Sequence, residues 1–119
     1  MTKFKCIIAG GRDFKDYNLL SNSLNKILVS KLPNVIIVSG MANGADQLGV
    51  LYASYMDLEF EPFPADWDKN GRGASHIRNR EMAVFANALI AFHDGISRGT
   101  ANMISVMEKL NKPVRIIKY

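Results

Sequence analysis

Short apolar runs alternate with helix-periodic segments along the whole chain. Five runs have the length and apolar composition of buried strands, and the segments between them repeat apolar residues every three or four positions. These periodicities predict a regular succession of strands and helices. The expected strands span residues 4–9, 35–38, 59–63, 89–92 and 114–117, and the expected helices span residues 16–32, 45–56, 75–86 and 99–110.

The alternation predicts a parallel sheet with helices on both faces, because strands that are apolar on both sides must be covered on both sides. We expect an α/β fold, a single Rossmann-like three-layer sandwich around a mainly parallel five-stranded sheet in the order 3-2-1-4-5. Pro62 and Pro64 predict that residues 59–63 form an edge strand, since proline cannot donate to a sheet ladder. This strand order leaves a crevice at the carboxyl ends of strands 1 and 4, where ligands of such folds bind.

Length and composition fit one domain over residues 1–119, with 48% hydrophobic residues to build its core. No apolar run approaches a membrane span and no signal-peptide pattern opens the chain, which predicts a cytoplasmic protein without a membrane partner. The one cysteine, Cys6, lies in an apolar run and is expected to be a buried thiol. The net charge of +4 favours anionic partners weakly.

Three loops that follow expected strands combine glycine with charged or hydroxyl residues, and they should meet at the crevice. Each glycine alone is equally well explained by a turn, but three such loops together favour an anion or nucleotide site. The expected ligand-binding residues are Gly10, Gly11, Arg12 and Asp13 in the first loop, Ser39, Gly40, Met41, Ala42, Gly44 and Asp46 in the second, and Asp94, Gly95, Ser97, Arg98, Gly99 and Thr100 in the third.

The third loop has the clearest chemistry, because it opens a helix. Backbone N–H groups and the Thr100 hydroxyl can hold phosphate oxygens, while Arg98 supplies a planar, permanently charged fork. Ser97 or Thr100 can also cap the helix, and the two roles are compatible. The sequence therefore predicts a phosphate site at this helix start.

Arg78 and Arg80 stand two positions apart near the start of another expected helix, so their side chains face different directions. We expect Arg78 to face the crevice. Glu81 shares a face with Arg78, and the pair is equally well explained as a surface ion pair. If the protein is an enzyme, Arg78 and Glu81 are the candidate catalytic residues.

Metal binding has weak support in the sequence. His76 and His93 lack the spacing of a zinc site, so no resident metal is expected. Aspartates near the crevice are able to hold Mg²⁺ beside a bound phosphate, which makes Mg²⁺ a possible cofactor together with such a ligand. The candidate aspartates are Asp13, Asp46, Asp66, Asp68 and Asp94.

The longest irregular segment, residues 64–74, is expected to be a solvated loop and is a candidate lid. Its Trp67 has two open explanations, stacking on a base and packing against Pro62 or Pro64. Neither the G-x-G-x-x-G spacing nor the P-loop motif occurs in the chain, which argues against ordinary NAD dehydrogenases and P-loop NTPases.

Five motifs in order resemble the YspA-like branch (DUF2493-type) of the SLOG superfamily, whose relatives include the LOG phosphoribohydrolases and the Rossmann-like domain of DprA. The resemblance covers nearly the whole chain and implies a Rossmann-like fold that binds nucleotides or nucleotide-derived ligands. The motifs are Ile8-Ala9-Gly10-Gly11-Arg12-Asp13-Phe14, the stretch from Ser39 to Asp46, Phe63-Pro64-Ala65-Asp66-Trp67-Asp68, Ile77-Arg78-Asn79-Arg80-Glu81-Met82-Ala83 and Asp94-Gly95-Ile96-Ser97-Arg98-Gly99-Thr100.

LOG enzymes carry an R-K-x-x-M helix and a glycine-rich loop followed by a catalytic glutamate. Arg78-Asn79-x-x-Met82 is similar to the first motif, which implies that Asn79 joins the ligand-binding residues, and Gly99-Thr100 is similar to part of the second. The glutamate position is Met103, so the LOG mechanism of N-glycosidic cleavage is doubtful. A substitute carboxylate, Glu81 or Asp46, is the alternative.

The Ser39 to Asp46 stretch is similar to the S-G-x-A-x-G-x-D motif of DprA, which binds single-stranded DNA. An aromatic and basic strip for a nucleic acid is not obvious in this chain, so nucleic acid is the less favoured partner. The preferred function is a sensor or ligand-sequestering module that binds a nucleotide or nucleotide-derived ligand, and the alternatives are a nucleotide-cleaving enzyme and single-stranded DNA binding. LOG-like relatives pair through helices beside the site, which implies a possible homo-oligomer.

Overall fold

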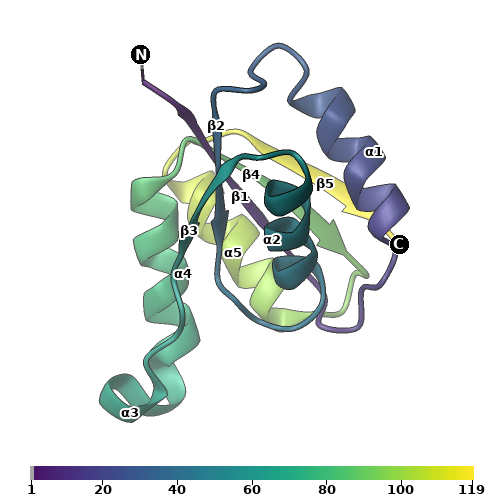
Figure 1. The fold of residues 1–119 in the computed structure, drawn as a ribbon. Coiled ribbons are helices and arrows are strands. Elements are labelled where there is room, and N and C mark those ends of the chain that lie inside the picture. The colour runs from purple at the N-terminus through teal and green to yellow at the C-terminus, as the bar shows by residue number, and fades with distance from the viewer. Residues whose placement is uncertain (1) are drawn as a thin grey trace.

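A five-stranded parallel sheet lies between two layers of helices in the computed structural model, which describes residues 2–119 (Figure 1). The strand order β3-β2-β1-β4-β5 confirms the predicted architecture. The strands are β1 (Phe4–Gly10), β2 (Val35–Ser39), β3 (Glu59–Pro62), β4 (Ala88–His93) and β5 (Val114–Lys118), and the helices are α1 (Tyr17–Ile27), α2 (Ala45–Tyr55), α3 (Trp67–Asn70), α4 (Ala74–Phe85) and α5 (Arg98–Lys109), with a 3₁₀ turn at Gly71–Gly73.

The central strand β1 supplies apolar side chains to both faces of the sheet, because successive residues of a strand point in opposite directions. Ile7 pairs in register with Val38 and Leu89, and these three residues belong to the core under α4 and α5. Ile8 belongs to the other core, which α1 and α2 cover, and it pairs with Ile90. Figure 1 shows these two helix pairs on opposite faces of the sheet.

β3 lies at one edge of the sheet, as Pro62 and the nearby Pro64 predict, and its four residues are exposed. Cys6 is buried in β1, and this burial raises the pKa of its thiol to about 12. Across residues 2–119 the helices are too short or too polar to traverse a bilayer.

The first helix is shorter than the periodicity predicts. It ends at Ile27 instead of residue 32, and the chain continues in turns in which the N–H groups of Lys31 and Leu32 both donate to the carbonyl of Leu28. Pro33 explains part of the error, because a residue that precedes proline is disfavoured in the helical conformation.

The prediction of an irregular loop over residues 64–74 is also wrong in part. Asp66 caps the short helix α3 by accepting a hydrogen bond from the N–H of Lys69 at 3.0 Å, and the 3₁₀ turn then leads directly into α4. No residue of α3 is buried. In Figure 1, α3 projects beyond the layered body of the protein.

Candidate functional site

The loops that follow β1 and β2 interlock through their backbones. Gly44 precedes α2 with a φ of 78°, and the next N–H, that of Ala45, donates to the carbonyl of Gly11 at 3.2 Å. A Cβ atom on Gly44 would lie 2.2 Å from that carbonyl oxygen, and one on Gly10 would lie 2.3 Å from the carbonyl oxygen of Phe92. Glycine is therefore required here by close backbone packing, whatever the loops bind.

The side chain of Ser39 stabilises the turn after β2 through hydrogen bonds to the backbone. Its fully buried hydroxyl donates to the carbonyl of Asp46 at 3.1 Å and accepts from the N–H of Met41 at 3.1 Å. The side chain thus holds the turn together and does not border the main cavity described below. This structural use differs from the ligand-binding role that the sequence predicts.

Asp46 lies buried in the first turn of α2 and faces the cavity with one carboxylate edge. Its Oδ2 accepts from the N–H of Ala42 at 3.2 Å. Burial raises the pKa of this carboxyl group to about 6, and the hydrogen bond from Ala42 and the charges of Arg78 and Arg12 oppose that rise.

Arg78 projects from α4 and ties together two strand ends. Its guanidinium donates to the carbonyl of Gly40 and, at 3.4 Å, to the carbonyl of Phe63, while its Nε donates to Oδ1 of Asn79 at 3.0 Å. A Cβ atom on Gly40 would lie 2.5 Å from the Arg78 guanidinium, so glycine makes room for the arginine. Burial lowers the pKa of Arg78, and the nearby Asp46 opposes this. Arg80 is exposed on α4 and does not border the cavity, as the sequence predicts.

Asn79 links α4 to the start of α5. Its amide donates to Oδ1 of Asn102 at 2.9 Å and to the carbonyl of Gly99 at 3.4 Å. The side chain is buried, with 6% of its surface exposed. It therefore fixes the distance between the two helices that form one wall of the cavity.

Ser97 caps the start of α5, but some backbone N–H groups of the first turn still lack an acceptor among the described residues. The Ser97 hydroxyl accepts from the N–H of Thr100 at 3.4 Å and lies 2.9 Å from the Thr100 hydroxyl. Asp94 accepts from the N–H groups of Ile96 and Ser97, and these two hydrogen bonds lower its pKa. In residues 2–119, no acceptor contacts the N–H groups of Arg98 and Gly99. The helix thus offers two free N–H groups and the positive end of its dipole.

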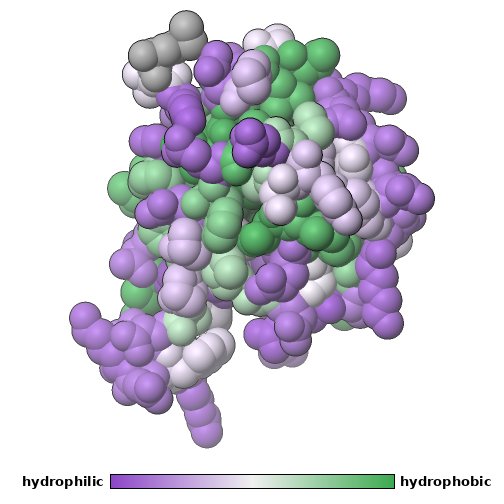
Figure 2. Space-filling model, in the orientation of Figure 1, coloured by the Kyte–Doolittle hydropathy of each residue, from purple (hydrophilic) through white to green (hydrophobic). Residues whose placement is uncertain are grey.

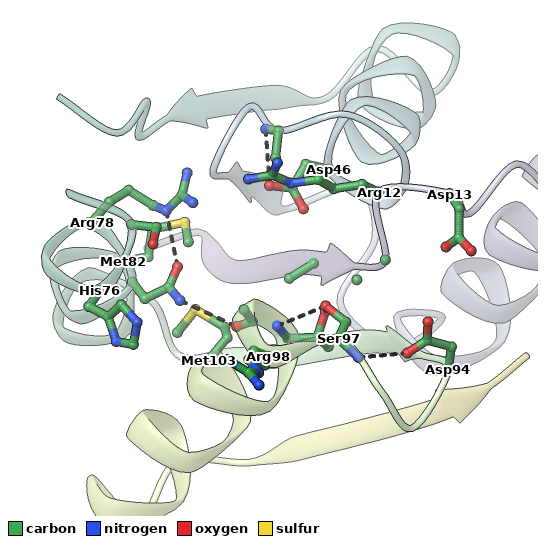
Figure 3. A pocket seen from close by; sticks show the side chains of 18 residues that line it. Arg12, Asp13, Asp46, His76, Arg78, Met82, Asp94, Ser97, Arg98 and Met103 are labelled. Atoms are coloured by element: carbon green, nitrogen blue, oxygen red, sulfur yellow. Dashed lines mark hydrogen bonds between the residues drawn. The ribbon is translucent and has the colours of Figure 1, made fainter. Parts of the chain in front are cut away.

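A cavity of about 480 Å³ lies between these loops and helices. Figure 3 shows Asp13 and Asp94 at one end, Arg78 and His76 at the other, and Arg12, Asp46 and Arg98 between them. Two carboxylates thus lie at one end of the cavity, and the carboxylate of Asp46 lies among the arginines that border the rest. The lining residues are Ala9, Gly10, Gly11, Arg12, Asp13, Ala42, Asp46, Ser75, His76, Arg78, Asn79, Met82, Asp94, Ser97, Arg98, Gly99, Thr100 and Met103.

Most of the predicted ligand-binding residues therefore border one cavity, and a few do not. Gly40 and Met41 border a smaller neighbouring hollow. Gly44 packs against the backbone of Gly11 and Arg12, and a Cβ atom on Gly95 would meet no atom within 4 Å. Glu81 is exposed on α4 and borders neither hollow, which argues against its role as a substitute catalytic carboxylate.

Sequence reasoning missed several residues of the cavity wall: Ala9, Ser75, His76 and Met82 were not predicted to bind ligand. Ser75 and Met82 stand three residues before and four residues after Arg78, and Met103 stands four residues after Gly99. Helical spacing from the predicted residues would have identified these neighbours. Met103, the position of the LOG glutamate, is almost fully buried in the wall.

Tyr119 also reaches the site, from the end of β5. Its hydroxyl donates to Oδ1 of Asp13 at 2.7 Å, and its N–H donates to the carbonyl of His93 at 3.3 Å. Burial and the neighbouring Asp13 raise the pKa of the phenol. Residues 2–119 contain no cluster of three or more metal-ligating side chains. Binding of Mg²⁺ together with a phosphate ligand stays a prediction.

Comparisons with known proteins agree with this fold and with the sequence motifs. A family model described as the YspA, cpYpsA-related SLOG family matches residues 4–70. The Gene 61 protein of Mycobacterium phage D29 is 32% identical over 116 residues, which cover 92% of this chain and 93% of the phage protein.

Two solved structures have a similar fold. The DNA processing protein A (DprA) from Streptococcus pneumoniae has a TM-score of 0.75 at 15% identity, and that from Helicobacter pylori, described for its single-stranded DNA binding mode, has a TM-score of 0.65 at 18% identity. Each match covers 97% of this chain, but the chain spans only 50% of the first protein and 65% of the second. At this level of identity the likeness concerns the fold.

Proposed function

The chain belongs to the YspA, cpYpsA-related SLOG family, and we propose that its crevice binds a nucleotide or a nucleotide-derived ligand. The observation that carries this proposal is a cavity of about 480 Å³ in which three arginines and the free N–H groups at the start of α5 lie close to the carboxylates of Asp13 and Asp94. That volume lies within the range of roughly 300–1,000 Å³ that is common for small-molecule sites. A nucleotide has the matching chemistry, an anionic group joined to a sugar with hydroxyl donors.

The phosphate would bind where α5 begins. The free N–H groups of Arg98 and Gly99 and the positive end of the helix dipole favour an anion there. Across residues 2–119 the Arg98 guanidinium has no hydrogen-bond or ion-pair partner, so it is available to a ligand without losing an internal contact. Arg12 lies on the facing wall and is exposed.

Sugar hydroxyl groups would bind toward the acidic end. Asp13 and Asp94 lie there, and ionised carboxylates accept hydrogen bonds from hydroxyl groups. Asp94 uses Oδ1 for the two backbone N–H groups, which leaves Oδ2 for a ligand. Asp46 offers a third carboxylate between the arginines.

Binding without turnover is the better match to the cavity chemistry. Met103, a thioether that is neither an acid nor a base, occupies the position of the LOG glutamate, and Glu81 lies outside the cavity. We therefore favour a cytoplasmic sensor or sequestering module over a nucleotide-cleaving enzyme. In the cleavage alternative, Asp46 is the remaining carboxylate near Arg78.

Titration calorimetry with a panel of nucleoside monophosphates and diphosphates tests this proposal. Arg98→Gln should weaken binding by about 10- to 150-fold, because a hydrogen bond to a charged group contributes about 1.5–3 kcal/mol. Arg80→Gln is the matched control, since it removes the same charge from an exposed position outside the cavity. Absence of binding across the panel, or equal losses in both variants, would overturn the proposal.

A second candidate is single-stranded DNA, favoured by the similarity of the fold to the Helicobacter pylori DprA structure. Binding to a DNA backbone releases counterions, so the affinity for an oligonucleotide should fall steeply between low and moderate salt. Fluorescence anisotropy with a labelled oligothymidylate measures this. Absent or salt-insensitive binding contradicts the DNA candidate and leaves the nucleotide proposal standing.

A further inference from the structure

A second hollow of about 280 Å³ adjoins the main cavity. It lies between the turn that follows β2 and the segment that follows β3. The two hollows share Arg12, Ala42 and Arg78, and the other residues of the second are Gly40, Met41, Asn43, Pro64, Ala65 and Trp67. Its volume is below the range of roughly 300–1,000 Å³ that is typical of a complete small-molecule site, so it suits one part of a ligand.

Trp67 gives this second hollow an aromatic surface. It is the single tryptophan of the chain, and 52% of its surface is exposed although it borders a concave site. The hydrogen bond from Lys69 to Asp66 fixes the short helix that carries it. Exposed aromatic rings in such positions stack on nucleic-acid bases, and Pro64 and Met41 add apolar surface beside it.

Arg12 and Arg78 lie at the boundary of the two hollows. Arg78 is held there by the carbonyls of Gly40 and Phe63, one from each side of the second hollow. A second phosphate bound at this boundary, in addition to the one at the start of α5, would have one substituent in each hollow. The charge of the nearby Asp46 offsets part of the charge of the arginines, which favours a bridging phosphate with a single negative charge over a terminal one with a charge near −2.

We propose that the natural ligand contains a bridging phosphate, with a nucleoside in the main cavity and a second ring group stacked on Trp67. The ligand class is thus a dinucleotide joined through a phosphodiester or a diphosphate. This inference rests on the proposed function and names its ligand more closely.

The intrinsic fluorescence of Trp67 provides a direct test. Adenosine monophosphate, diadenosine diphosphate and the dinucleotide pApA are titrated into the full chain, and affinities are measured in parallel by calorimetry. A dinucleotide should quench the fluorescence and bind about 5- to 150-fold more tightly than the monophosphate, which follows from about 1–3 kcal/mol for stacking one base. The monophosphate should bind with little quenching.

Variants at Trp67 separate stacking from folding. Trp67→Ala should reduce dinucleotide affinity to that of the monophosphate without changing monophosphate affinity, and Trp67→Phe should keep most of the preference. Tyr55→Ala is the matched control, because Tyr55 is an aromatic residue that is 73% exposed and borders neither hollow.

The outcomes distinguish the two proposals. If the monophosphate binds and neither dinucleotide binds more tightly or quenches, the inference is overturned and the proposed function stands. If none of the three ligands binds, the inference is overturned, and the proposed function is overturned with it when the wider nucleotide panel also fails to bind. Preference for diadenosine diphosphate identifies a diphosphate bridge, preference for pApA identifies a phosphodiester bridge, and either supports the inference.

Discussion

The two segments that flank the second hollow both contain glycines with positive φ, yet the surroundings of those glycines are opposite. Gly44 precedes α2 with φ 78° and ψ −127°, and a Cβ there would lie 2.2 Å from a backbone oxygen. Gly71 follows α3 with φ 57° and ψ −135°, and a Cβ there would have no atom within 4 Å. The backbone conformation is nearly the same, and only the crowding differs.

This difference distinguishes a framework, the turn that contains Gly44, from an appendage, the segment around α3. The turn that contains Gly44 is locked to the loop after β1, so its shape is set by the same packing that holds the sheet together. The segment around α3 has no buried residue, and Figure 2 shows mostly hydrophilic side chains where it projects from the body. The first segment can therefore tolerate little change, whereas the second has few internal contacts to lose.

The largest expected effect is that of Gly44→Ala. The strained backbone conformation costs about 1–3 kcal/mol for an alanine, and forcing a methyl group against Gly11 and Arg12 costs about 1–3 kcal/mol more. The free energy of unfolding should therefore fall by about 2–6 kcal/mol in urea denaturation. A loss below about 1 kcal/mol would show that the two loops are not locked together.

Asp46 provides a test of whether a buried charge in the framework lowers the stability of the protein. Its pKa is raised from 3.8 to about 6 in the folded protein, so the folded state binds the proton more tightly than the unfolded chain does. Wild-type stability should therefore decrease as the pH rises from about 4 to about 7, by about 2 kcal/mol from this group alone.

Asp46→Asn removes that dependence. The stability of the variant relative to the wild type should rise over the same pH interval, as measured by urea denaturation at several pH values. Because the other titrating groups are present in both proteins, only the difference between the two curves is interpreted. Parallel curves would contradict a raised pKa at Asp46.

Gly71→Ala isolates the backbone cost without the crowding. We expect a loss of about 1–3 kcal/mol, since the strained conformation remains but the methyl group meets no atom. Thermal denaturation beside Gly44→Ala gives the difference directly. Equal losses in the two variants would mean that crowding contributes nothing at Gly44, and the distinction between framework and appendage would fail.

Gly73→Ala should have the smallest effect and the opposite sign. Gly73 has φ −83° and ψ 0°, a conformation that alanine adopts readily, and its surroundings are open. Replacement should raise the free energy of unfolding by about 0.4–1 kcal/mol, because it reduces the freedom of the unfolded chain. A decrease in melting temperature would show that the 3₁₀ turn needs glycine at this position.

The fold was predictable because its signals are local and repeated. Uniformly apolar strands and periodic helices determine the layers, and the two prolines near β3 determine an edge of the sheet. The meeting of the three loops follows from topology alone, since parallel strands end at the same side. The two-residue offset between Arg78 and Arg80 predicts that their side chains face different directions, but it does not say which of the two faces the crevice.

Other parts of the site depend on contacts between distant segments, which no local pattern contains. Tyr119 reaches Asp13 only because β5 lies beside β4, and the inward position of the Ser39 hydroxyl depends on the backbone of Asp46. The second hollow exists because Asp66 starts a helix where the sequence predicts a loop. The cap has a local signal, an aspartate three residues before Lys69, but a helix of four residues is too short to show a periodicity.

The central position of β1 has a consequence for synthesis of the protein. One edge of β1 pairs with β2, which follows soon along the chain. The other edge stays unpaired until β4 (Ala88–His93) has been synthesised. At roughly 5–20 residues per second, a ribosome leaves that second edge open for several seconds. An open edge that carries Cys6, Ile7 and Ile8 is a template for pairing with another nascent chain, so premature termination before β4 should produce aggregates rather than a smaller folded protein.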